Sequence, residues 1–388
     1  MTDFHERAAI MEYDGGMDRA AAETAAVATT QPLIKSTLRL HQAHALAELR
    51  SSMKRGRKRV MVQAPTGAGK TILAAAIVAS ARERGNKVVF CVPALSLIDQ
   101  TVEAFASEGL YDVGVIQAQH MMTDWSQPIQ IASVQTLERR PEPEADLVII
   151  DEAHRWFGHY EKWMTASPDL RFIGLSATPW TRGLGKWFDD LVIAATTRRL
   201  IDEGYLSDFE VYACDHPDLS GVKTVAGDYH EGQLSKAVNK TALVANVVET
   251  WMRLGKGLPT LVFGVDRAHA ASLHSAFEAA GIRSAYQDAY TDPMDRSDIR
   301  RAFGNGDLDV VCNVGTLTTG VDWDVRCIVL ARPTKSEILY TQIIGRGLRT
   351  APWKDKCLIL DHSDTTLKLG FVDDINHETL HDGSKNVA

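Results

Sequence analysis

Short apolar runs separated by amphipathic stretches recur along most of this chain of 388 residues. In its first half, TILAAAIVASARERG has the spacing of an amphipathic helix that ends near Gly85, as helices commonly end at glycine. The apolar runs around it, each bounded by polar or turn residues, occupy residues 60 to 64, 88 to 92, 147 to 151 and 172 to 177. Buried strands that alternate with helices predict a parallel sheet covered on both faces.

The same pattern returns in the second half, after a less regular stretch over about residues 204 to 240. A chain of this length exceeds what one hydrophobic core usually serves. We therefore expect an α/β fold with two tandem domains, at residues 32 to 205 and 206 to 388. The second set of predicted strands occupies residues 260 to 265, 310 to 315, 327 to 331 and 357 to 361.

The first 31 residues have a different composition. They are mostly small or polar and hold few large apolar side chains that could anchor a core. We expect a flexible or weakly helical segment there.

Composition narrows the class of protein. The net charge of −8 argues against a globally basic, histone-like binder, although a local basic groove stays compatible with it. No apolar run reaches 18 residues, and charges stand where a signal peptide would have its apolar core, so we expect a cytoplasmic protein without a membrane partner. The five cysteines form no CxxC pair, which predicts buried thiols of a reducing compartment and no zinc site.

A phosphate-binding motif follows the first predicted strand. APTGAGKT, residues 64 to 71, lies between that strand and a helix, which is the context such a loop requires. Its backbone N–H groups and the helix N-terminus favour an anion, Lys70 can reach the β and γ phosphates, and Thr71 can bind Mg²⁺. The expected nucleotide-binding residues of this loop are Thr66, Gly67, Ala68, Gly69, Lys70 and Thr71. Ala64 departs from the general pattern, which has glycine there.

Two carboxylates end the predicted strand LVIID. Asp151 and Glu152 of DEAH stand at its carboxyl end, where α/β sheets bind ligands. Asp151 is placed to hold Mg²⁺ and Glu152 to orient and deprotonate the attacking water. Acids that cap the next helix are the plain alternative in isolation, but together with the upstream loop these residues predict an NTPase that uses Mg²⁺.

Further motifs occur in a fixed order. SAT at residues 176 to 178, VGTLTTGVD at 314 to 322 and QIIGRGLR at 342 to 349 follow the two motifs above. With them the chain resembles the superfamily 2 helicases over about residues 38 to 362. The resemblance implies two RecA-like domains with ATP in the cleft between them.

The resemblance also implies roles for single residues. Arg346 and Arg349 would act as arginine fingers on the γ-phosphate, and Gln342 would position water or phosphate. Taken in isolation, the two arginines could equally be surface cations capping a helix end, but the other motifs of the chain favour the arginine fingers. Arg39 and Gln42 would meet the adenine, Gly320 and Asp322 would also bind the nucleotide, and Ser176, Thr178 and His154 would couple the motifs.

Nucleic-acid contacts follow from the segments that track a strand in this family. Several of these residues could simply be turn residues. Trp156 and Trp180 invite a base-stacking role, but packing is the more ordinary role for tryptophan. The expected contacts are Ser96, Gln100, Ser133, Gln135, Thr136, Arg267, Thr318 and Lys335.

The second half is most similar to the bacterial RadD-like group and related phage and prophage helicases. This resemblance implies an ATP-dependent DNA helicase or translocase with a monomeric core, acting on single-stranded or forked DNA in repair, recombination or replication. RadD itself carries a cysteine-rich, zinc-finger-like region beyond its helicase core, and because these 388 residues contain no CxxC pair, the resemblance does not extend to the function of that region. An RNA helicase and an ATP-gated clamp that does not move along DNA are the alternatives.

Overall fold

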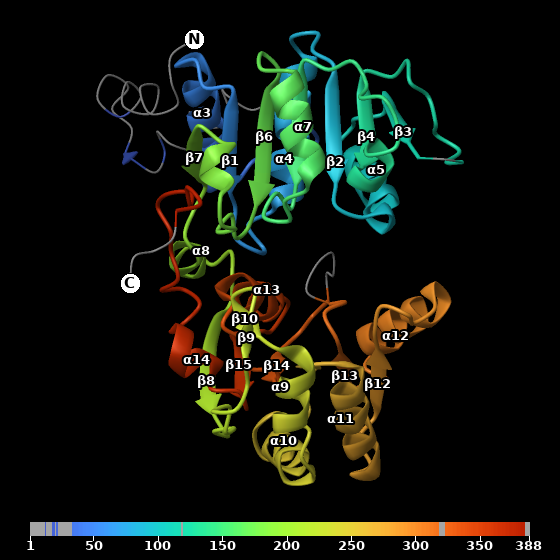
Figure 1. Cartoon of the computed structure of the whole chain (residues 1–388), viewed down its shortest axis with the longest axis vertical. Helices are drawn as coiled ribbons and strands as arrows, with labels where there is room; N and C mark the ends of the chain where they lie inside the picture. Colours follow the sequence, from blue (N-terminus) through green and yellow to red (C-terminus); the bar gives the residue numbers. More distant parts are fainter. Residues whose placement is uncertain are drawn as a thin grey trace. The chain divides into compact units, whose positions relative to one another are not determined.

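The computed structural model describes residues 33–117, 119–317 and 323–384, with positions 12, 18, 19 and 21 (Figure 1). The chain divides into one unit made of Met1–Thr196 with His377–Ala388 and a second made of Thr197–Asn376. This division differs from the predicted boundary after residue 205 in two ways. The second unit begins at Thr197, and the last residues, from His377 on, belong to the first unit. Most of the predicted N-terminal segment, residues 1 to 31, lies outside the described residues.

The first unit is built on a seven-stranded sheet in which every neighbouring pair is parallel (Figure 1). The strand order is β3-β4-β2-β5-β6-β1-β7. All carboxyl ends therefore meet at one edge of the sheet. The strands are β1 (Arg59–Gln63), β2 (Val88–Val92), β3 (Val113–Ile116), β4 (Ile129–Ser133), β5 (Leu147–Asp151), β6 (Arg171–Ser176) and β7 (Asp190–Ile193).

Helices connect these strands. The largest, α3 and α4, precede and follow β1. From residue 33 on, the helices of this unit are α3 (Leu40–Lys54), α4 (Lys70–Arg82), η1 (Leu95–Leu97), α5 (Ile98–Ser107), α6 (Val134–Leu137), α7 (Gly158–Ala166) and η2 (Leu184–Lys186). The predicted strands at 88 to 92 and 147 to 151 are confirmed at both ends, and the other two are displaced by one residue. The sequence did not predict β3, β4 and β7.

The second unit holds a six-stranded sheet, again parallel throughout, in the order β12-β13-β11-β14-β15-β8. Its four predicted strands are present. The other two, β8 and β12, are edge strands that the sequence did not predict, and β8 lies in the stretch that looked irregular. The strands are β8 (Asp208–Ala213), β11 (Thr260–Phe263), β12 (Ser284–Gln287), β13 (Val310–Asn313), β14 (Cys327–Leu330) and β15 (Lys356–Asp361).

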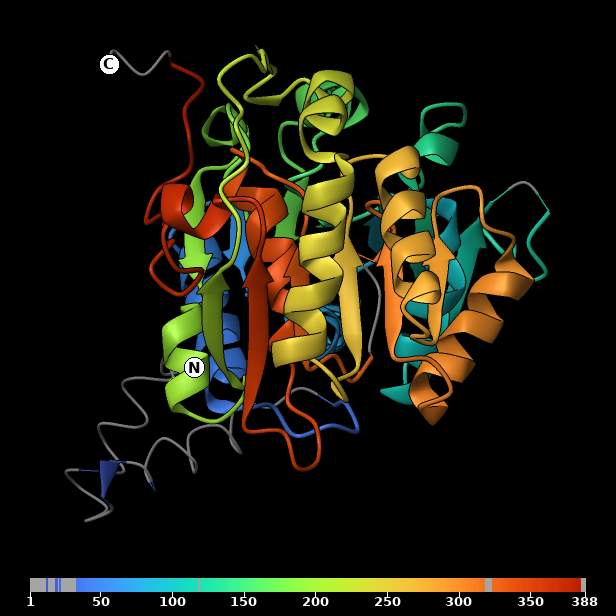
Figure 2. The same cartoon turned by 90° about the horizontal axis from the view of Figure 1, so that it is seen from below.

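Helices α10 and α11 run side by side along one face of this sheet (Figure 2). A small antiparallel hairpin of β9 (Thr224–Val225) and β10 (Asp228–Tyr229) precedes them. The helices of the second unit are α8 (Thr197–Asp202), α9 (Glu231–Val238), α10 (Thr241–Leu254), α11 (Arg267–Ala279), α12 (Pro293–Asn305), α13 (Glu337–Gly347) and α14 (Thr365–Leu369). The two predicted RecA-like sheets are thus confirmed.

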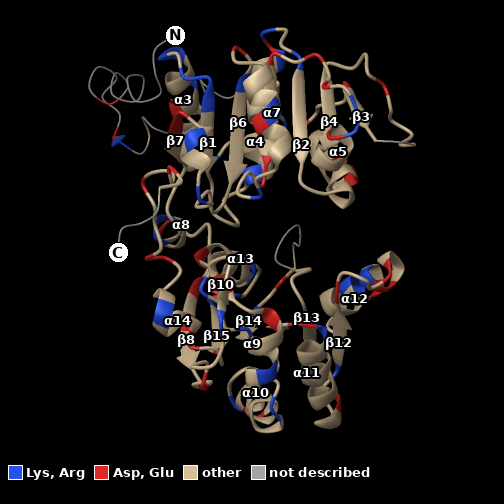
Figure 3. Cartoon of the chain, in the orientation of Figure 1, with Lys and Arg blue, Asp and Glu red and all other residues tan. Residues whose placement is uncertain are grey.

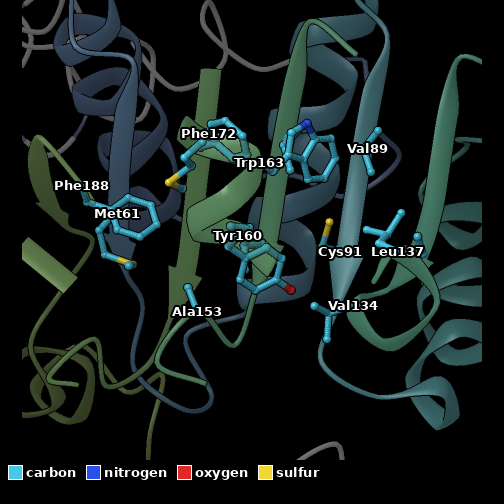
Figure 4. Packing of buried hydrophobic residues seen from close by; sticks show 14 of the residues in the cluster. Met61, Val89, Cys91, Val134, Leu137, Ala153, Tyr160, Trp163, Phe172 and Phe188 are labelled. Atoms are coloured by element: carbon cyan, nitrogen blue, oxygen red, sulfur yellow. The ribbon is translucent and has the colours of Figure 1, made fainter. Parts of the chain in front are cut away.

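Each unit has its own apolar core. In the first, Tyr160 and Trp163 of α7 pack on the sheet among Cys91 and Phe172 (Figure 4). The rings of Trp163 and Phe172 meet edge-on with centroids 5.7 Å apart. In the second unit, Trp251 of α10 is buried in the apolar cluster together with Phe277. All five cysteines are free thiols; four are buried and Cys214 is half-buried.

The last described residues extend the core of the first unit. Leu380 packs against its apolar cluster. The carbonyl oxygen of His381 accepts hydrogen bonds from the backbone N–H of Gly183 and Gly185, at 3.1 and 2.9 Å. This segment is therefore an integral part of the first unit, although it follows the second in the sequence.

Charges are mixed along both units. Figure 3 shows Lys and Arg interspersed with Asp and Glu, with both kinds on α12. Among the described residues, none of the helices combines the length and apolarity needed to cross a membrane.

Candidate ATP-binding and nucleic-acid sites

The loop between β1 and α4 has the backbone shape of a phosphate cradle. Gly67 and Gly69 have φ angles of +87° and +77°, which only glycine adopts readily. Lys70 is the first residue of α4, so its side chain starts at the helix N-terminus, where backbone N–H groups lack partners within the helix and favour an anion. The predicted residues Thr66, Ala68 and Thr71 belong to the same loop and first turn.

Side chains of helix α3 contact the backbone of this loop. The buried side chain of Gln42 donates through Nε2 to the carbonyl oxygens of Ala68 and Gly69, both at 3.0 Å. His41 Nε2 lies 2.9 Å from the same Ala68 oxygen. Gln42 Oε1 accepts from the backbone N–H of Arg39, which is exposed at the start of α3. Gln42 thus holds the phosphate-binding loop in place. The sequence predicted a contact of Gln42 with adenine but not this structural role.

Lys70 lies between two carboxylates at the carboxyl end of β5. Its Nζ is 2.5 Å from Glu152 Oε1 and 3.1 Å from Asp151 Oδ1. Glu152 has a φ of +48°, an uncommon backbone conformation for a residue with a side chain, and its N–H donates to Asp151 Oδ1 at 2.9 Å. The structure therefore brings three predicted catalytic residues together.

Burial and the oppositely charged neighbours act in opposite directions on the pKa of Lys70 and on that of Asp151. Burial works to lower the pKa of Lys70, but the negative charges of Asp151 and Glu152 outweigh it and raise that pKa. Burial, aided by the charge of Glu152, raises the pKa of Asp151 against the pull of Lys70. The result is a charge-compensated cluster whose cation stays protonated near neutral pH.

His154 links this cluster to the end of β6. Its Nδ1 lies 2.9 Å from Ser176 Oγ and 3.3 Å from Glu152 Oε2. Ser176 Oγ also accepts from the backbone N–H of Thr178 at 3.0 Å. Burial lowers the pKa of His154 to about 4, so the imidazole is neutral at pH 7. The predicted coupling residues are thus joined by hydrogen bonds.

The arginine motif forms the end of α13 in the second unit. Gln342 and Arg346 are buried there, 8% and 6% exposed, whereas Arg349 is half-buried just beyond the helix. Lys354 Nζ donates to the carbonyl oxygens of Gly347 and Arg349, at 2.5 and 2.6 Å. The arginines therefore belong to a well-packed helix end.

Gly347 permits this close packing. A Cβ at this position would overlap Cys357 Sγ and lie 2.9 Å from Ile328 Cγ1. This glycine therefore brings α13 onto the sheet.

Three predicted residues, Thr318, Gly320 and Asp322, lie outside the described residues.

The predicted nucleic-acid contacts of the first unit differ among themselves. Ser96, Gln100 and Gln135 are exposed, with Gln135 Nε2 donating to the carbonyl oxygen of Pro93 at 2.8 Å. Ser133 is fully buried, and its hydroxyl caps α6 by accepting from the backbone N–H of Thr136. The Ser133 hydroxyl therefore serves as a helix cap, and a contact of this residue with a nucleic-acid strand, through its side chain or its backbone amide, stays a prediction.

In the second unit, both predicted cations are exposed but partnered. Lys335 Nζ lies 4.7 Å from the ring centroid of Tyr229 and donates to Thr224 Oγ1 at 2.6 Å. Arg267 Nε donates to Asp288 Oδ2 at 2.5 Å. Sequence reasoning did not single out Asp288, or Tyr290 beside it, because neither belongs to a recognised motif.

The two tryptophans considered for stacking have packing partners. Trp156 packs against the first core, and its Nε1 donates to Glu161 Oε1 at 2.9 Å. The ring of Trp180 lies 4.8 Å from that of His377. The packing interpretation is confirmed for Trp156.

Two family models match the chain, one for each half. Residues 35–181 match the type III restriction enzyme res subunit, and residues 240–351 match the helicase conserved C-terminal domain. A relative, the IRC3 protein of Saccharomyces cerevisiae, named as an ATP-dependent helicase, is 31% identical over 360 residues. The chain belongs to the superfamily 2 helicases. The two matched regions are the two halves of a helicase core of the restriction-enzyme-like group.

This helicase spans 51% of the IRC3 protein, and the alignment covers 84% of the helicase itself. Among solved structures, a fragment of an HsdR subunit of a type I restriction enzyme from Vibrio vulnificus YJ016 superimposes with a TM-score of 0.69 and 21% identity. That match covers 97% of the helicase and 72% of the fragment.

A second solved structure has the same fold. It is the ATP-dependent type ISP restriction-modification enzyme LlaBIII bound to DNA, with a TM-score of 0.63 and 17% identity. The match covers 84% of the helicase and 28% of LlaBIII.

Proposed function

We propose that this helicase is a DNA-dependent ATPase that uses hydrolysis of Mg·ATP to move along, or remodel, single-stranded or branched DNA. One observation carries the proposal: Lys70, at the end of a glycine-rich loop, lies within 3.1 Å of both Asp151 and Glu152. A cation and two acids at the carboxyl edge of a parallel sheet are the parts that phosphoryl transfer requires.

The cluster gives each residue a role once a nucleotide binds. A triphosphate brings negative charge to the loop and competes with the carboxylates for Lys70. Release of Lys70 to the phosphates leaves Glu152 as a base for the attacking water. His154, neutral and within 3.3 Å of Glu152, orients that carboxylate and connects it to Ser176.

The donor atoms present suit Mg²⁺. Thr71 offers a hydroxyl and Asp151 a carboxylate, both oxygen ligands of the kind that this ion prefers. When bound, the ion would neutralise charge on the phosphates. The residues that would hold it are Thr71 and Asp151.

The arginines complete the proposal. Arg346 and Arg349 stabilise charge on the γ-phosphate, and Gln342 positions the water. Because they belong to the second unit and the phosphate loop to the first, hydrolysis becomes sensitive to movement of one unit relative to the other. Such sensitivity is what a motor needs.

DNA is the favoured polymer because a structure of the same fold, LlaBIII, is described as bound to DNA. Repair, recombination and replication are the processes in which branched and single-stranded DNA arise, and we place the activity there. We expect the core to act as a monomer.

The experiment is ATP hydrolysis measured without polymer and with single-stranded DNA, duplex DNA, forked DNA or RNA. We expect stimulation by single-stranded or forked DNA. Arg346→Ala should lower the stimulated rate by about 10³-fold or more, while Arg283→Ala, an exposed arginine paired with Asp309, should leave it unchanged. Stimulation by RNA alone would select an RNA helicase. Hydrolysis indifferent to all polymers and to Arg346 would contradict the proposal.

A further inference from the structure

An exposed tyrosine in the second unit forms a cation–π contact with an arginine. The guanidinium carbon of Arg267 lies 4.8 Å from the ring centroid of Tyr290. Tyr290 is 80% exposed and the side chain of Arg267 is 65% exposed. The pair therefore offers a planar aromatic surface and a positive charge to solvent at the same place.

A buried carboxylate holds the pair in position. The side chain of Asp288 is only 4% exposed and accepts from Arg267 Nε at 2.5 Å, from Tyr286 Oη at 2.8 Å and from the backbone N–H of Tyr290 at 2.8 Å. Asp288 Oδ1 also accepts from the N–H of Thr291 at 3.0 Å. One carboxylate thus fixes both members of the pair.

The turn itself is anchored from the next helix. The guanidinium of Arg296 in α12 donates to the carbonyl oxygens of Asp288, Ala289 and Thr291 at 3.1, 2.7 and 2.9 Å. A surface loop with this many internal bonds is already ordered. Binding through it loses little conformational entropy.

The pair stands at the edge of the sheet where ligands bind. Arg267 begins α11, four residues after β11 ends, and Tyr290 follows β12 by three residues. Both strands are parallel to β13 between them, so both loops lie at the carboxyl edge of the second sheet.

The chemistry of this surface selects its ligand. An exposed aromatic ring stacks with any nucleobase, and an adjacent guanidinium adds attraction to base and phosphate. Bases inside a duplex are stacked on each other and are not available, so the ligand is an unpaired nucleotide. We propose that Tyr290 and Arg267 form a base-stacking platform for single-stranded nucleic acid. The inference rests on the proposed function, since it assumes that the chain binds such a strand.

The helicase offers a matched control. Tyr111 is 67% exposed, and Lys35 Nζ lies 5.4 Å from its ring centroid. Tyr111 precedes β3 and therefore lies at the opposite, amino edge of its own parallel sheet. Tyr111 is thus exposed beside a cation, as Tyr290 is, but it does not lie at the carboxyl edge of a sheet.

The test compares the binding of two fluorescent strands of equal length, oligo(dT) and a fully abasic DNA, with oligo(U) as the RNA arm. Base stacking contributes about 5- to 150-fold in affinity per base. We expect Tyr290→Ala to weaken oligo(dT) binding by that factor and to leave abasic binding unchanged. Tyr290→Phe, which keeps the ring, and Tyr111→Ala should both bind as the wild type does. Thermal melting checks that each variant is folded.

The outcomes separate the two proposals. If wild type binds oligo(dT) and Tyr290→Ala keeps the same ratio of oligo(dT) to abasic affinity, the platform is wrong and the proposed function stands. A Tyr290→Ala variant that binds both strands more weakly by the same factor also overturns the platform, because the loss would then not depend on bases. A wild type that binds none of the three strands overturns both proposals.

Discussion

The carboxyl edges of the two sheets share the same parallel-strand geometry but differ in the charged side chains that they present and in how far these side chains are exposed. At the first, Lys70 is shared by two partly enclosed carboxylates, and the surrounding loop is fixed by buried side chains of α3. At the second, Arg267 and Tyr290 face solvent above one buried acid. The first edge suits a small, highly charged ligand, and the second suits one part of a long polymer. The same parallel-sheet geometry therefore serves two kinds of ligand, depending on how far its charges are exposed.

The largest expected effect separates chemistry from binding at the first edge. Glu152→Gln keeps size and one oxygen for Lys70 but removes the base. We expect stimulated ATP hydrolysis to fall by about 10²- to 10⁴-fold, while binding of a fluorescent ATP analogue persists. Undiminished hydrolysis in this variant would assign the base to another residue.

A second comparison concerns acid sensitivity and uses one of the buried histidines of each unit. Burial lowers the pKa of both His154 and His269 to about 4. His269 Nδ1 accepts from the backbone N–H of Val265 at 3.3 Å, which requires an unprotonated nitrogen. Below pH 6.5 the unfolded chain binds protons that the folded chain does not. Stability is therefore full above about pH 6.5 and is lost as the pH falls toward 4, by roughly 3 kcal/mol per histidine at most.

Hydrogen exchange at pH 7 and pH 5 measures this loss in each unit separately. His154→Asn should flatten the pH dependence of the first unit only, and His269→Asn that of the second only. Unchanged pH dependence in both variants would show that other groups govern acid unfolding.

A third comparison contrasts two glycines of the second unit. Gly347→Ala places a methyl group against Cys357 and Ile328 and should lower the free energy of unfolding by about 1–3 kcal/mol. Gly304 in α12 has nothing within 4 Å of a built Cβ, so Gly304→Ala should be neutral or stabilising by about 0.5–1 kcal/mol. Urea unfolding measures both. Equal effects would mean that α13 does not depend on close packing at Gly347.

The smallest expected effect concerns the returning segment. Leu380→Ala removes part of an apolar side chain that packs on the first core. Since Leu380 is only half-buried, we expect a loss of about 1 kcal/mol in the first unit and none in the second. Destabilisation of the second unit instead would contradict the assignment of this segment.

These comparisons also show what the sequence could predict. Buried central strands such as β2 and β5 were predicted to the residue, because continuous apolar runs with polar ends have few alternatives. Most of the missed strands are edge strands: β8 is half-exposed along its length and β12 is four residues of modest hydrophobicity. The exception is β4, a buried interior strand whose apolar run is interrupted by Gln130. The loop and carboxylates of the first edge follow from motifs whose spacing reflects their chemistry.

Contacts between distant segments could not be predicted. The bond from Gly185 to His381 joins residues far apart in the sequence, and no local pattern marks either partner. The platform of Arg267 and Tyr290 depends on Asp288, whose burial becomes visible only when two loops meet. Ser133 shows the converse, because its motif suggested a ligand contact and its burial shows a helix cap.

We expect the energy of ATP hydrolysis to drive movement of this protein along DNA. The most direct measurement is displacement of streptavidin from either biotinylated end of single-stranded DNA, under single-turnover conditions with a trap for free protein. We predict displacement from one end that requires ATP and is absent in Glu152→Gln. Stimulated ATP hydrolysis with no displacement from either end would contradict movement and would identify an ATP-gated clamp.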